Sequence, residues 1–264
     1  MPAMRIAVVV HDSRAEATAF AATLEKVARD KGLELVAPRA EDRPEMVIAV
    51  GGDGTMLRAV RLGLAVDVPV LGFNLGHLGF LAEAEPSELD VVFDALADNK
   101  HEIRKRMTIE ASLSNGSHHL GVNDVVVEKI ESQRLVALAV DIDSERYHTY
   151  RADGLVVSTP TGSSAYNFSA GGPLVDPQLE AIVLTPVAAH SLFSRSLVLS
   201  PASNIRLAVT ADRPVRVSVD GLEVGTLTQG DWVLVRRGPR PARFVSFAGR
   251  TFPMTVRDKF QLEP

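Results

Sequence analysis

Apolar residues follow two different spacings along the first hundred residues of the chain. Continuous apolar runs at 6–10, 46–50 and 68–73 are typical of buried strands. Between them, apolar residues three and four positions apart predict helices, the first of which reaches Lys31. Strands that alternate with helices favour a parallel sheet covered by helices. We therefore expect a Rossmann-like α/β domain over residues 1–100.

Two of these helices are preceded by residues that commonly cap helices. Asp12 or Ser13 stands before the first helix. Ser87 and Asp90 have the spacing of a capping box for a later helix that ends at Ala97. We expect the helices to begin at these positions.

The spacing changes near Lys100, and short segments that alternate apolar and polar residues dominate from there. Turn residues such as Asn115-Gly116 and Asp220-Gly221 separate them. This predicts an all-β, sandwich-like domain over residues 101–264, interrupted by one helix after Thr161-Gly162, with a C-terminal tail that can pack back on the first domain. The predicted strands are Thr108–Leu113, Val122–Val127, Leu135–Ile142, Arg146–Tyr150, Ile205–Val209, Val215–Val219, Trp232–Val235 and Phe244–Phe247.

Composition narrows the classes of protein that need to be considered. The net charge of −5 argues against a general surface for nucleic acid or for an anionic membrane. The chain has no cysteine, which excludes disulfides, thiol catalysis and cysteine-ligated zinc. Its N-terminal apolar run is too short for a signal peptide, and no run has the length of a transmembrane helix. We expect a cytoplasmic protein.

The run Gly51-Gly52-Asp53-Gly54-Thr55 is the strongest chemical signal in the chain. It joins the apolar run at 46–50 to a helical pattern. Glycines let the backbone approach a ligand closely, and the start of a helix suits a phosphate group. Phosphate would repel the carboxylate of Asp53, so this side chain needs another purpose there. Accepting a proton or contacting a metal ion is such a purpose.

Two further clusters lie at or beside apolar segments. Asn74–Leu81 contains two glycines, and a plain turn over apolar residues explains it equally well. Asn123 and Asp124 stand inside an apolar context, where neighbouring side chains point to opposite faces of a strand. One of them would face the core unless the strand ends there or meets a ligand. Taken alone, the pair favours an ordinary surface turn.

A hydroxyl-rich cluster covers residues 151–166. Arg151 and Asp153 come first, and the segment from Ser158 to Tyr166 follows. Its hydroxyl and amide groups suit sugar and phosphate oxygens, and the tyrosine ring suits stacking on a base. The ordinary alternative is a loop rich in serine and threonine that caps a helix.

Several well-known motifs are missing. There is no G-x-x-x-x-G-K-[ST] phosphate loop, and Leu57 replaces the third glycine of a dinucleotide fingerprint that would begin at Gly52. There is no H-E-x-x-H metal motif. The phosphate site, if the sequence holds one, is therefore of another type.

Taken together, these segments resemble the NAD kinases. That family shows a GGDGT turn, an N-x-G-x-L-G-F-L turn, an Asn-Glu or Asn-Asp pair, and D-G followed by T-P-T-G-S-[ST]-A-Y and S-A-G-G-P. All of these occur here in that order. GGDGT alone is shared with lipid kinases and phosphofructokinases, whereas its combination with the segment from Thr159 to Tyr166 is highly specific.

The resemblance implies an active site between an α/β domain and a β-rich, NAD-binding domain. It implies transfer of a phosphoryl group from ATP or another donor to the adenosine ribose 2′-hydroxyl of NAD, with Mg²⁺ or another divalent cation, in a homo-oligomer. Asp53 matches the proton acceptor, and no metal ligands among the side chains are implied. The implied donor loop is Gly51, Gly52, Gly54 and Thr55. The implied NAD-binding residues are Asp53, Gly54, Arg58, Asn123, Asp124, Arg151, Asp153, Thr161, Gly162, Ser163, Ser164, Ala165, Tyr166 and Ala188.

Some positions depart from the family pattern, and two other functions stay open. Asp124 replaces the commoner glutamate, and Leu222 stands where many members carry glutamine. Arg195 is expected either to be solvated or to contact phosphate or a neighbouring subunit. The alternatives are a lipid kinase, which would need a basic or apolar membrane-facing stripe, and a non-catalytic NAD(H) or NADP(H) sensor. The preferred donor and the acceptance of NADH stay undecided.

Overall fold

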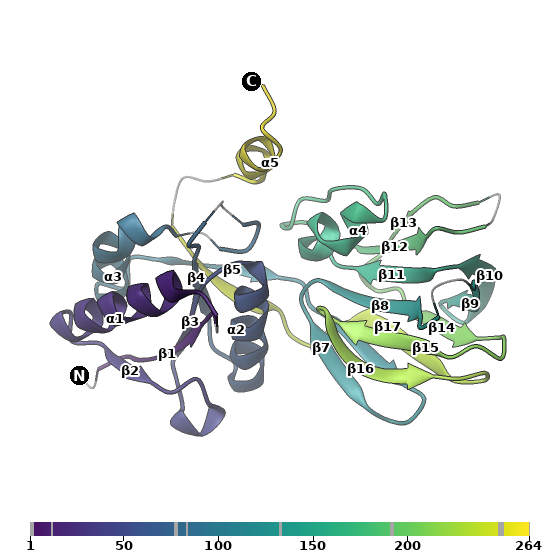
Figure 1. Cartoon of the computed structure of the whole chain (residues 1–264), viewed down its shortest axis with the longest axis horizontal. Coiled ribbons are helices and arrows are strands. Elements are labelled where there is room, and N and C mark those ends of the chain that lie inside the picture. Colours follow the sequence, from purple (N-terminus) through teal and green to yellow (C-terminus); the bar gives the residue numbers. More distant parts are fainter. Residues whose placement is uncertain are drawn as a thin grey trace. The chain divides into compact units, whose positions relative to one another are not determined.

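The computed structural model describes residues 3–11, 13–76, 79–82, 84–131, 134–190, 193–247 and 251–263. The chain divides into two compact units, which Figure 1 shows with their elements labelled. Unit 1 comprises Met1–Lys105 and Ala242–Pro264, and unit 2 comprises Arg106–Pro241. Within the described ranges, no helix combines the length and the apolar character that crossing a bilayer requires.

Unit 1 is built on a six-stranded sheet with the order β2-β1-β3-β4-β18-β5. The pairs β1/β2, β1/β3, β3/β4 and β4/β18 are parallel. The predicted α/β class with a parallel sheet is thereby confirmed. The strands are β1 Arg5–Val10, β2 Glu34–Val36, β3 Met46–Val50, β4 Val70–Phe73, β5 Glu102–Arg106 and β18 Ala242–Ser246.

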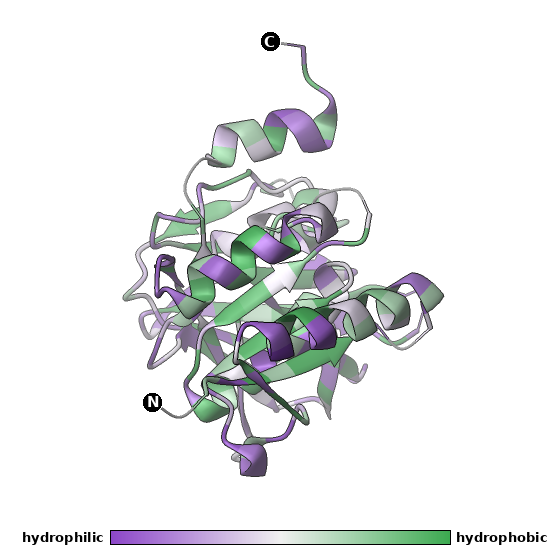
Figure 2. Ribbon diagram, turned by 90° about the vertical axis from the view of Figure 1, so that its left-hand side faces the viewer, coloured by the Kyte–Doolittle hydropathy of each residue, from purple (hydrophilic) through white to green (hydrophobic). Residues whose placement is uncertain are grey.

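Helices cover both faces of this sheet. Helices α1 (Ala15–Asp30) and α3 (Leu89–Ala97) share one apolar core with alternate residues of the strands, including Ile48. Helix α2 (Asp53–Val66) lies against the other face, where a Cβ at Gly72 would approach the Met56 sulfur to 2.8 Å. In Figure 2 the strands are largely apolar, while the helices carry both apolar and polar bands. The continuous apolar runs of the strands thus reflect burial on both faces.

The helix starts differ from the predicted caps. Helix α1 begins at Ala15 after Arg14, without a side-chain cap, and Asp12 lies outside the described residues. The capping box before α3 is formed by Glu85 and Glu88 around a 3-10 turn, Pro86–Glu88, and not by Ser87 and Asp90. Pro86 at the first position of this turn places the box two residues earlier, because its fixed φ suits a helix start. A second 3-10 turn spans Ala40–Asp42.

The last predicted strand joins the sheet of unit 1. Strand β18 lies beside β4, with Phe244 opposite Val70. Its alternating pattern resembles that of the unit 2 strands before it. For this reason it was predicted from the sequence as part of the all-β domain. Helix α5 (Phe252–Phe260) follows in the same unit, where the rings of Phe80 and Phe260 lie 6.3 Å apart.

Unit 2 consists of two antiparallel six-stranded sheets, with orders β10-β9-β14-β17-β6-β7 and β13-β12-β11-β8-β15-β16. Apolar residues of both sheets form one core, which confirms the sandwich. The first sheet contains β6 Ile109–Leu113, β7 His118–Gly121, β9 Val136–Ile142, β10 Glu145–Ala152, β14 Ile205–Val209 and β17 Trp232–Arg237. The second contains β8 Asp124–Lys129, β11 Gly154–Ser158, β12 Ile182–Val187, β13 Leu197–Leu199, β15 Val215–Val219 and β16 Leu222–Leu227.

One short helical segment interrupts the strands of unit 2, as the sequence predicts. A 3-10 turn, Thr161–Ser164, leads into the four-residue helix α4, Tyr166–Ser169. The chain leaves this helix through Gly171, which has a φ of +86°. The segment follows directly from the end of β11, so it is positioned by the second sheet.

Candidate functional site

The glycine turn of unit 1 joins the end of β3 to the start of α2. Gly52 caps the helix, and its carbonyl oxygen accepts hydrogen bonds from the N–H groups of Thr55 and Met56, both at 3.0 Å. Asp53 is the first residue of the helix. The first turn of a helix presents N–H groups that lack partners inside the helix, together with the positive end of its dipole. This end of α2 therefore suits a phosphate group.

The side chain of Asp53 lies directly against the second predicted turn. A Cβ atom added at Gly79 would stand 2.1 Å from Oδ1 of Asp53, so any larger residue here would displace the carboxylate. Oδ1 of Asp53 is buried and has no hydrogen-bond partner among the described residues. A carboxylate oxygen in such a position needs a partner from a ligand or from solvent. Of the Asn74–Leu81 segment, His77 and Leu78 lie outside the described residues.

A cavity of about 410 Å³ opens beside the glycine turn. Its wall includes Gly52, Gly54 and Thr55, and three side chains that carry or can carry positive charge: His11, Arg14 and Arg58. Arg58 is oriented by a hydrogen bond of 2.9 Å from Nη2 to the carbonyl oxygen of Val10. These side chains can neutralise the charge of a phosphate ligand.

His11 and Arg14 were not predicted from the sequence. Both follow the carboxyl end of β1, and β1 pairs with β3 so that Val10 lies opposite Val50. The N–H group of His11 donates to the carbonyl oxygen of Val50 at 3.0 Å. Because ligands of parallel sheets bind at the carboxyl ends of the strands, the predicted strand at 6–10 contained the signal needed to find both residues.

In unit 2, Asp124 is the first residue of β8 and Asn123 precedes it; both are buried, with 5% and 8% of their surface exposed. The carboxylate of Asp220 accepts hydrogen bonds from the N–H groups of Val122, Asn123 and Asp124 at 2.8, 2.7 and 3.2 Å. Oδ1 of Asn123 is buried and has no partner among the described residues. Asp220, which the sequence marks only as a turn residue, thus fixes the backbone of the pair.

The carboxyl group of Asp124 lies in an unfavourable place for a charge. Burial raises its pKa from 3.8 to about 7, and the neighbouring carboxylate of Asp220 adds to the rise. Buried charges of this kind are retained in proteins mostly where they serve a ligand or a reaction. The interpretation of the pair as an ordinary surface turn is therefore wrong, because both residues are buried.

The hydroxyl-rich segment packs onto the backbone of this pair. The N–H group of Thr159 donates to the carbonyl oxygen of Asn123 at 2.9 Å, and its hydroxyl donates to that of Val122 at 2.5 Å. The hydroxyl of Thr159 also accepts the N–H group of Gly162 at 3.1 Å. A Cβ at Gly162 would lie 2.1 Å from the carbonyl oxygen of Asn123. The pair at 123–124 and the hydroxyl-rich segment from Ser158 to Tyr166 therefore pack together.

Not every hydroxyl of this segment faces outward. Ser163 is fully buried, and its Oγ exchanges hydrogen bonds with the backbone of Val175, at 2.9 and 3.2 Å. Thr161 is buried, whereas Ser164 and Ala165 are half-buried. The hydroxyl of Ser163 serves the fold, and Ser164 is the more accessible of the two serines.

Tyr166 opens helix α4 and keeps 37% of its surface exposed. Burial and the nearby carboxylates of Glu128, Asp153 and Asp124 raise the pKa of its phenol. Helix α4 packs against β11, and the ring of Tyr166 stays partly exposed beside these carboxylates. A ring in this position can stack on a flat aromatic group.

The remaining candidates lie at the far end of β11. The register pairs Ser158 with Asp124 at one end of the strand and Gly154 with Val187 at the other, about 13 Å away at 3.3 Å per residue. Asp153 is at this far end and pairs with Lys129 at 2.6 Å. Ala188, the residue after β12, is exposed and has a φ of +47°. Arg151 is exposed and lines a separate cavity of unit 2.

The described residues contain no cluster of three or more histidine or acidic side chains that could enclose a metal ion. Mg²⁺ does not need such a cluster, since it keeps several waters and binds one or two carboxylates together with the phosphates of a substrate. Oδ1 of Asp53 has no partner among the described residues and lies next to a helix start suited to phosphate, which fits that mode of binding.

Comparison with known families decides between the classes that share a GGDGT turn. Residues 6–101 match the model of the ATP-NAD kinase N-terminal domain, and residues 122–247 match that of the ATP-NAD kinase C-terminal domain. The chain belongs to the ATP-NAD kinase family. The glycine turn and the pair at 123–124 thus lie in the two matched domains of one family.

Individual relatives agree with this assignment. The NAD kinase of Moorella thermoacetica is 43% identical over 221 residues, which cover 82% of this chain and 71% of the relative. That of Corynebacterium glutamicum is 38% identical over 229 residues, covering 84% and 79%. Among solved structures, yeast NADH kinase complexed with NADH has a TM-score of 0.87 at 26% identity, covering 100% of this chain and 89% of its own. An Archaeoglobus fulgidus NAD kinase in complex with ATP has a TM-score of 0.81 at 25% identity, covering 97% and 99%.

Proposed function

We propose that this chain transfers the γ-phosphoryl group of ATP to the 2′-hydroxyl of the adenosine ribose of NAD and so produces NADP. Membership of the ATP-NAD kinase family assigns the chain the phosphorylation of NAD. The observation that supports the residue roles most strongly is the position of Asp53. Its buried oxygen, which has no partner in the part of the chain that the structure describes, lies at a helix start suited to phosphate.

In this mechanism the glycine turn holds the donor. The N–H groups at the start of α2 bind phosphate oxygens, and His11, Arg14 and Arg58 offset the negative charge around the cavity. A divalent cation, bound with the donor and next to Asp53, would neutralise further charge on the phosphates. Orientation and charge balance supply most of the catalysis that phosphoryl transfer needs.

Asp53 acts on the acceptor. Its carboxylate accepts a hydrogen bond from the ribose 2′-hydroxyl and directs that oxygen at the γ-phosphorus. A bond forms between the 2′-oxygen and the γ-phosphorus, and the bond from that phosphorus to the oxygen bridging it to the β-phosphate breaks. The hydroxyl proton passes to the carboxylate of Asp53 late in the transfer, and solvent then removes it.

The residues of unit 2 hold the dinucleotide. Oδ1 of Asn123 and the carboxyl group of Asp124 are buried acceptors for amino or hydroxyl groups of NAD. Tyr166 offers its exposed face to a base. We propose supporting contacts with NAD for Gly54, Arg58, Arg151, Asp153, Thr161, Gly162, Ser163, Ser164, Ala165 and Ala188. For Ser163 the contact would come from the backbone, because its hydroxyl is engaged with Val175.

We also propose that the enzyme works in the cytoplasm as a homo-oligomer. The location fits the proposed substrates, ATP and NAD, which are cytoplasmic solutes. The oligomer follows from the resemblance to the family, and sedimentation of the purified chain would test it.

One assay separates this function from its alternatives. The purified chain is incubated with NAD, ATP and Mg²⁺, and NADP is measured with an NADP-specific dehydrogenase. Formation of NADP supports the kinase, whereas tight binding of NAD without turnover would indicate a sensor. Phosphorylation of a diacylglycerol vesicle in place of NAD would indicate a lipid kinase. Parallel reactions with NADH, with other triphosphates and with polyphosphate define the acceptor and the donor.

A further inference from the structure

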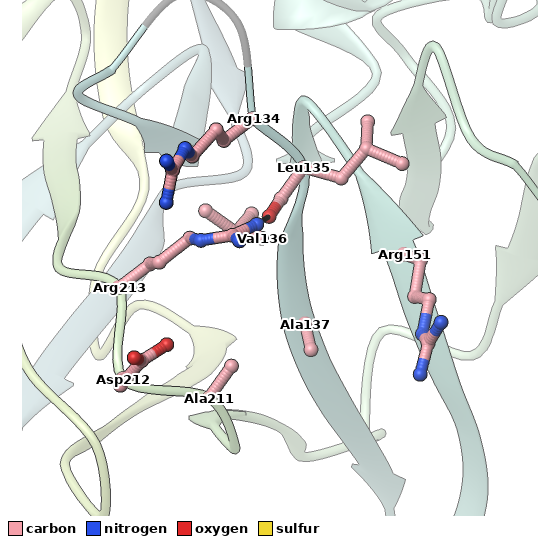
Figure 3. Close-up of a pocket in the computed structure, with 8 residues that line it drawn as sticks. All are labelled: Arg134, Leu135, Val136, Ala137, Arg151, Ala211, Asp212 and Arg213. Atoms are coloured by element: carbon pink, nitrogen blue, oxygen red, sulfur yellow. Dashed lines mark hydrogen bonds between the residues drawn. The ribbon is translucent and has the colours of Figure 1, made fainter.

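A second cavity in unit 2 carries a concentration of arginines. It has a volume of about 490 Å³ and is lined by Arg134, Arg151 and Arg213 together with Asp212. Figure 3 shows Arg134 on the loop before β9, Arg151 on β10 and Arg213 on the loop that follows β14. The small side chains of Ala137 and Ala211 lie between them. The β9–β10 hairpin and the loop after β14 thus bring three arginines to the lining of one cavity.

The three guanidinium groups are not equivalent. Arg213 is half-buried, and its Nη1 donates to the carbonyl oxygen of Leu135 at 2.8 Å, which fixes its orientation. Arg134 and Arg151 are exposed, and neither side chain has a hydrogen bond or ion pair with any residue that the structure describes. Asp212 is the one carboxylate of the lining, so the cavity carries three positive charges against one negative charge.

This arrangement differs from that of other arginines in unit 2. Elsewhere in the unit, five arginines lie beside carboxylates, at 2.5 to 3.3 Å. They are Arg146 and Arg206 with Asp141, Arg216 with Glu223, Arg236 with Glu110, and Arg237 with Glu180. In a chain with a net charge of −5, a hollow with an excess of positive charge is unusual. An external anion would supply the missing partners.

We propose that Arg134, Arg151 and Arg213 form a binding site for a condensed phosphate, a group with two adjacent phosphates. The excess of two positive charges matches a pyrophosphate diester, and planar guanidinium groups bind phosphate oxygens in pairs. Three guanidinium groups spread around one cavity can contact two linked phosphates together. Asp212 opposes the ligand and limits its affinity.

The condensed phosphate can come from two sources. One is the pyrophosphate of the dinucleotide, and this source rests on the proposed function, which already includes Arg151. The other is free pyrophosphate or a short polyphosphate, which would bind independently of NAD. The two sources share the same chemistry at the arginines, so the test includes both ligands.

The experiment uses the full chain labelled with ¹³C at the alanine methyl groups. The methyl signals of Ala137 and Ala211 are followed by NMR while sodium pyrophosphate is added at constant ionic strength without divalent cations. These two methyl groups report on this cavity and not on the glycine turn, which also suits phosphate. The readout does not depend on turnover, so it can succeed or fail whatever the NADP assay shows.

Three variants sharpen the result. Arg134→Gln removes one guanidinium group of the cavity and should weaken binding about tenfold. Asp212→Asn removes the opposing charge and should strengthen binding about threefold. Arg236→Gln is the matched control, because that arginine is paired with Glu110 outside the cavity.

The expected result is a saturable shift of both methyl signals in the wild type, with the stated order of affinities among the variants. Absence of a saturable shift, or equal affinity in the Arg134→Gln and Arg236→Gln variants, would overturn the site. If NAD produces the same shifts and competes with pyrophosphate, the ligand is the dinucleotide. If NAD leaves both signals in place, the ligand is a free condensed phosphate.

Discussion

Replacing Asp124 with asparagine should make the protein more stable at high pH. The unfolded chain releases the proton of this carboxyl group near pH 4, whereas the folded protein holds it until about pH 7. The folded state therefore loses stability as the pH rises between these values. Each pH unit is worth about 1.4 kcal/mol, so the full loss above pH 7 is about 4 kcal/mol. The asparagine variant has no such proton to release.

The measurement compares the free energy of unfolding of the variant with that of the wild type. From pH 5 to pH 8 the difference should move in favour of the Asp124→Asn variant by about 2.5 kcal/mol. Urea unfolding followed by fluorescence is suitable, since the chain has a single tryptophan, Trp232, which lies on β17 of unit 2. The exposed Asp212→Asn variant serves as the control for the loss of one negative charge.

A difference that stays within about 1 kcal/mol between the two pH values would refute this reasoning. It would mean that the carboxylate of Asp124 is well solvated in the folded protein. The buried pair at 123–124 would then not lower the stability of the fold, as a buried binding residue is expected to do. In the predicted case, the variant should also lose affinity for NAD while it gains stability. That exchange of stability for binding is typical of functional residues.

Three further changes test the site. Gly79→Ala should lower kcat about a hundredfold by displacing Asp53. Gly76→Ala is the control and should keep kcat, because its Cβ meets no atom within 4 Å. Equal kcat values for the two variants would contradict the contact between Gly79 and Asp53. Arg14→Gln should raise the KM for ATP about tenfold and leave the KM for NAD unchanged, and a change in the KM for NAD alone would count against its place in the donor cavity. Tyr166→Ala should raise the KM for NAD about tenfold while Tyr166→Phe keeps it; a raised KM in both variants would point to the phenol hydroxyl, and an unchanged KM in both would contradict stacking by the ring.

The sequence predicted the α/β unit well because its signals are local. Strands buried on both faces leave continuous apolar runs, as in β3, and glycine marks the turn before α2. Strand β11 shows the limit of this approach. It is equally apolar, but polar residues flank it on both sides, so it was not predicted as a strand from the sequence. It is buried because it pairs with β8 and β12.

Contacts between distant segments account for most of what was missed. Strand β18 pairs with β4 across more than 170 residues, and no local pattern encodes that choice of sheet. The sequence shows Asp220 only as a turn residue, whereas in the fold its carboxylate accepts a hydrogen bond from the N–H group of Asn123. In the same way, the three arginines of the second cavity meet only after β9, β10 and the loop after β14 are assembled.

The central claim is that the carboxylate of Asp53 handles the acceptor hydroxyl of NAD during phosphoryl transfer. The most direct measurement is kcat for NADP formation by the Asp53→Asn variant, together with its affinity for NAD by calorimetry. The account predicts a loss in kcat of about a thousandfold with an affinity close to that of the wild type. Turnover near the wild-type rate would contradict it.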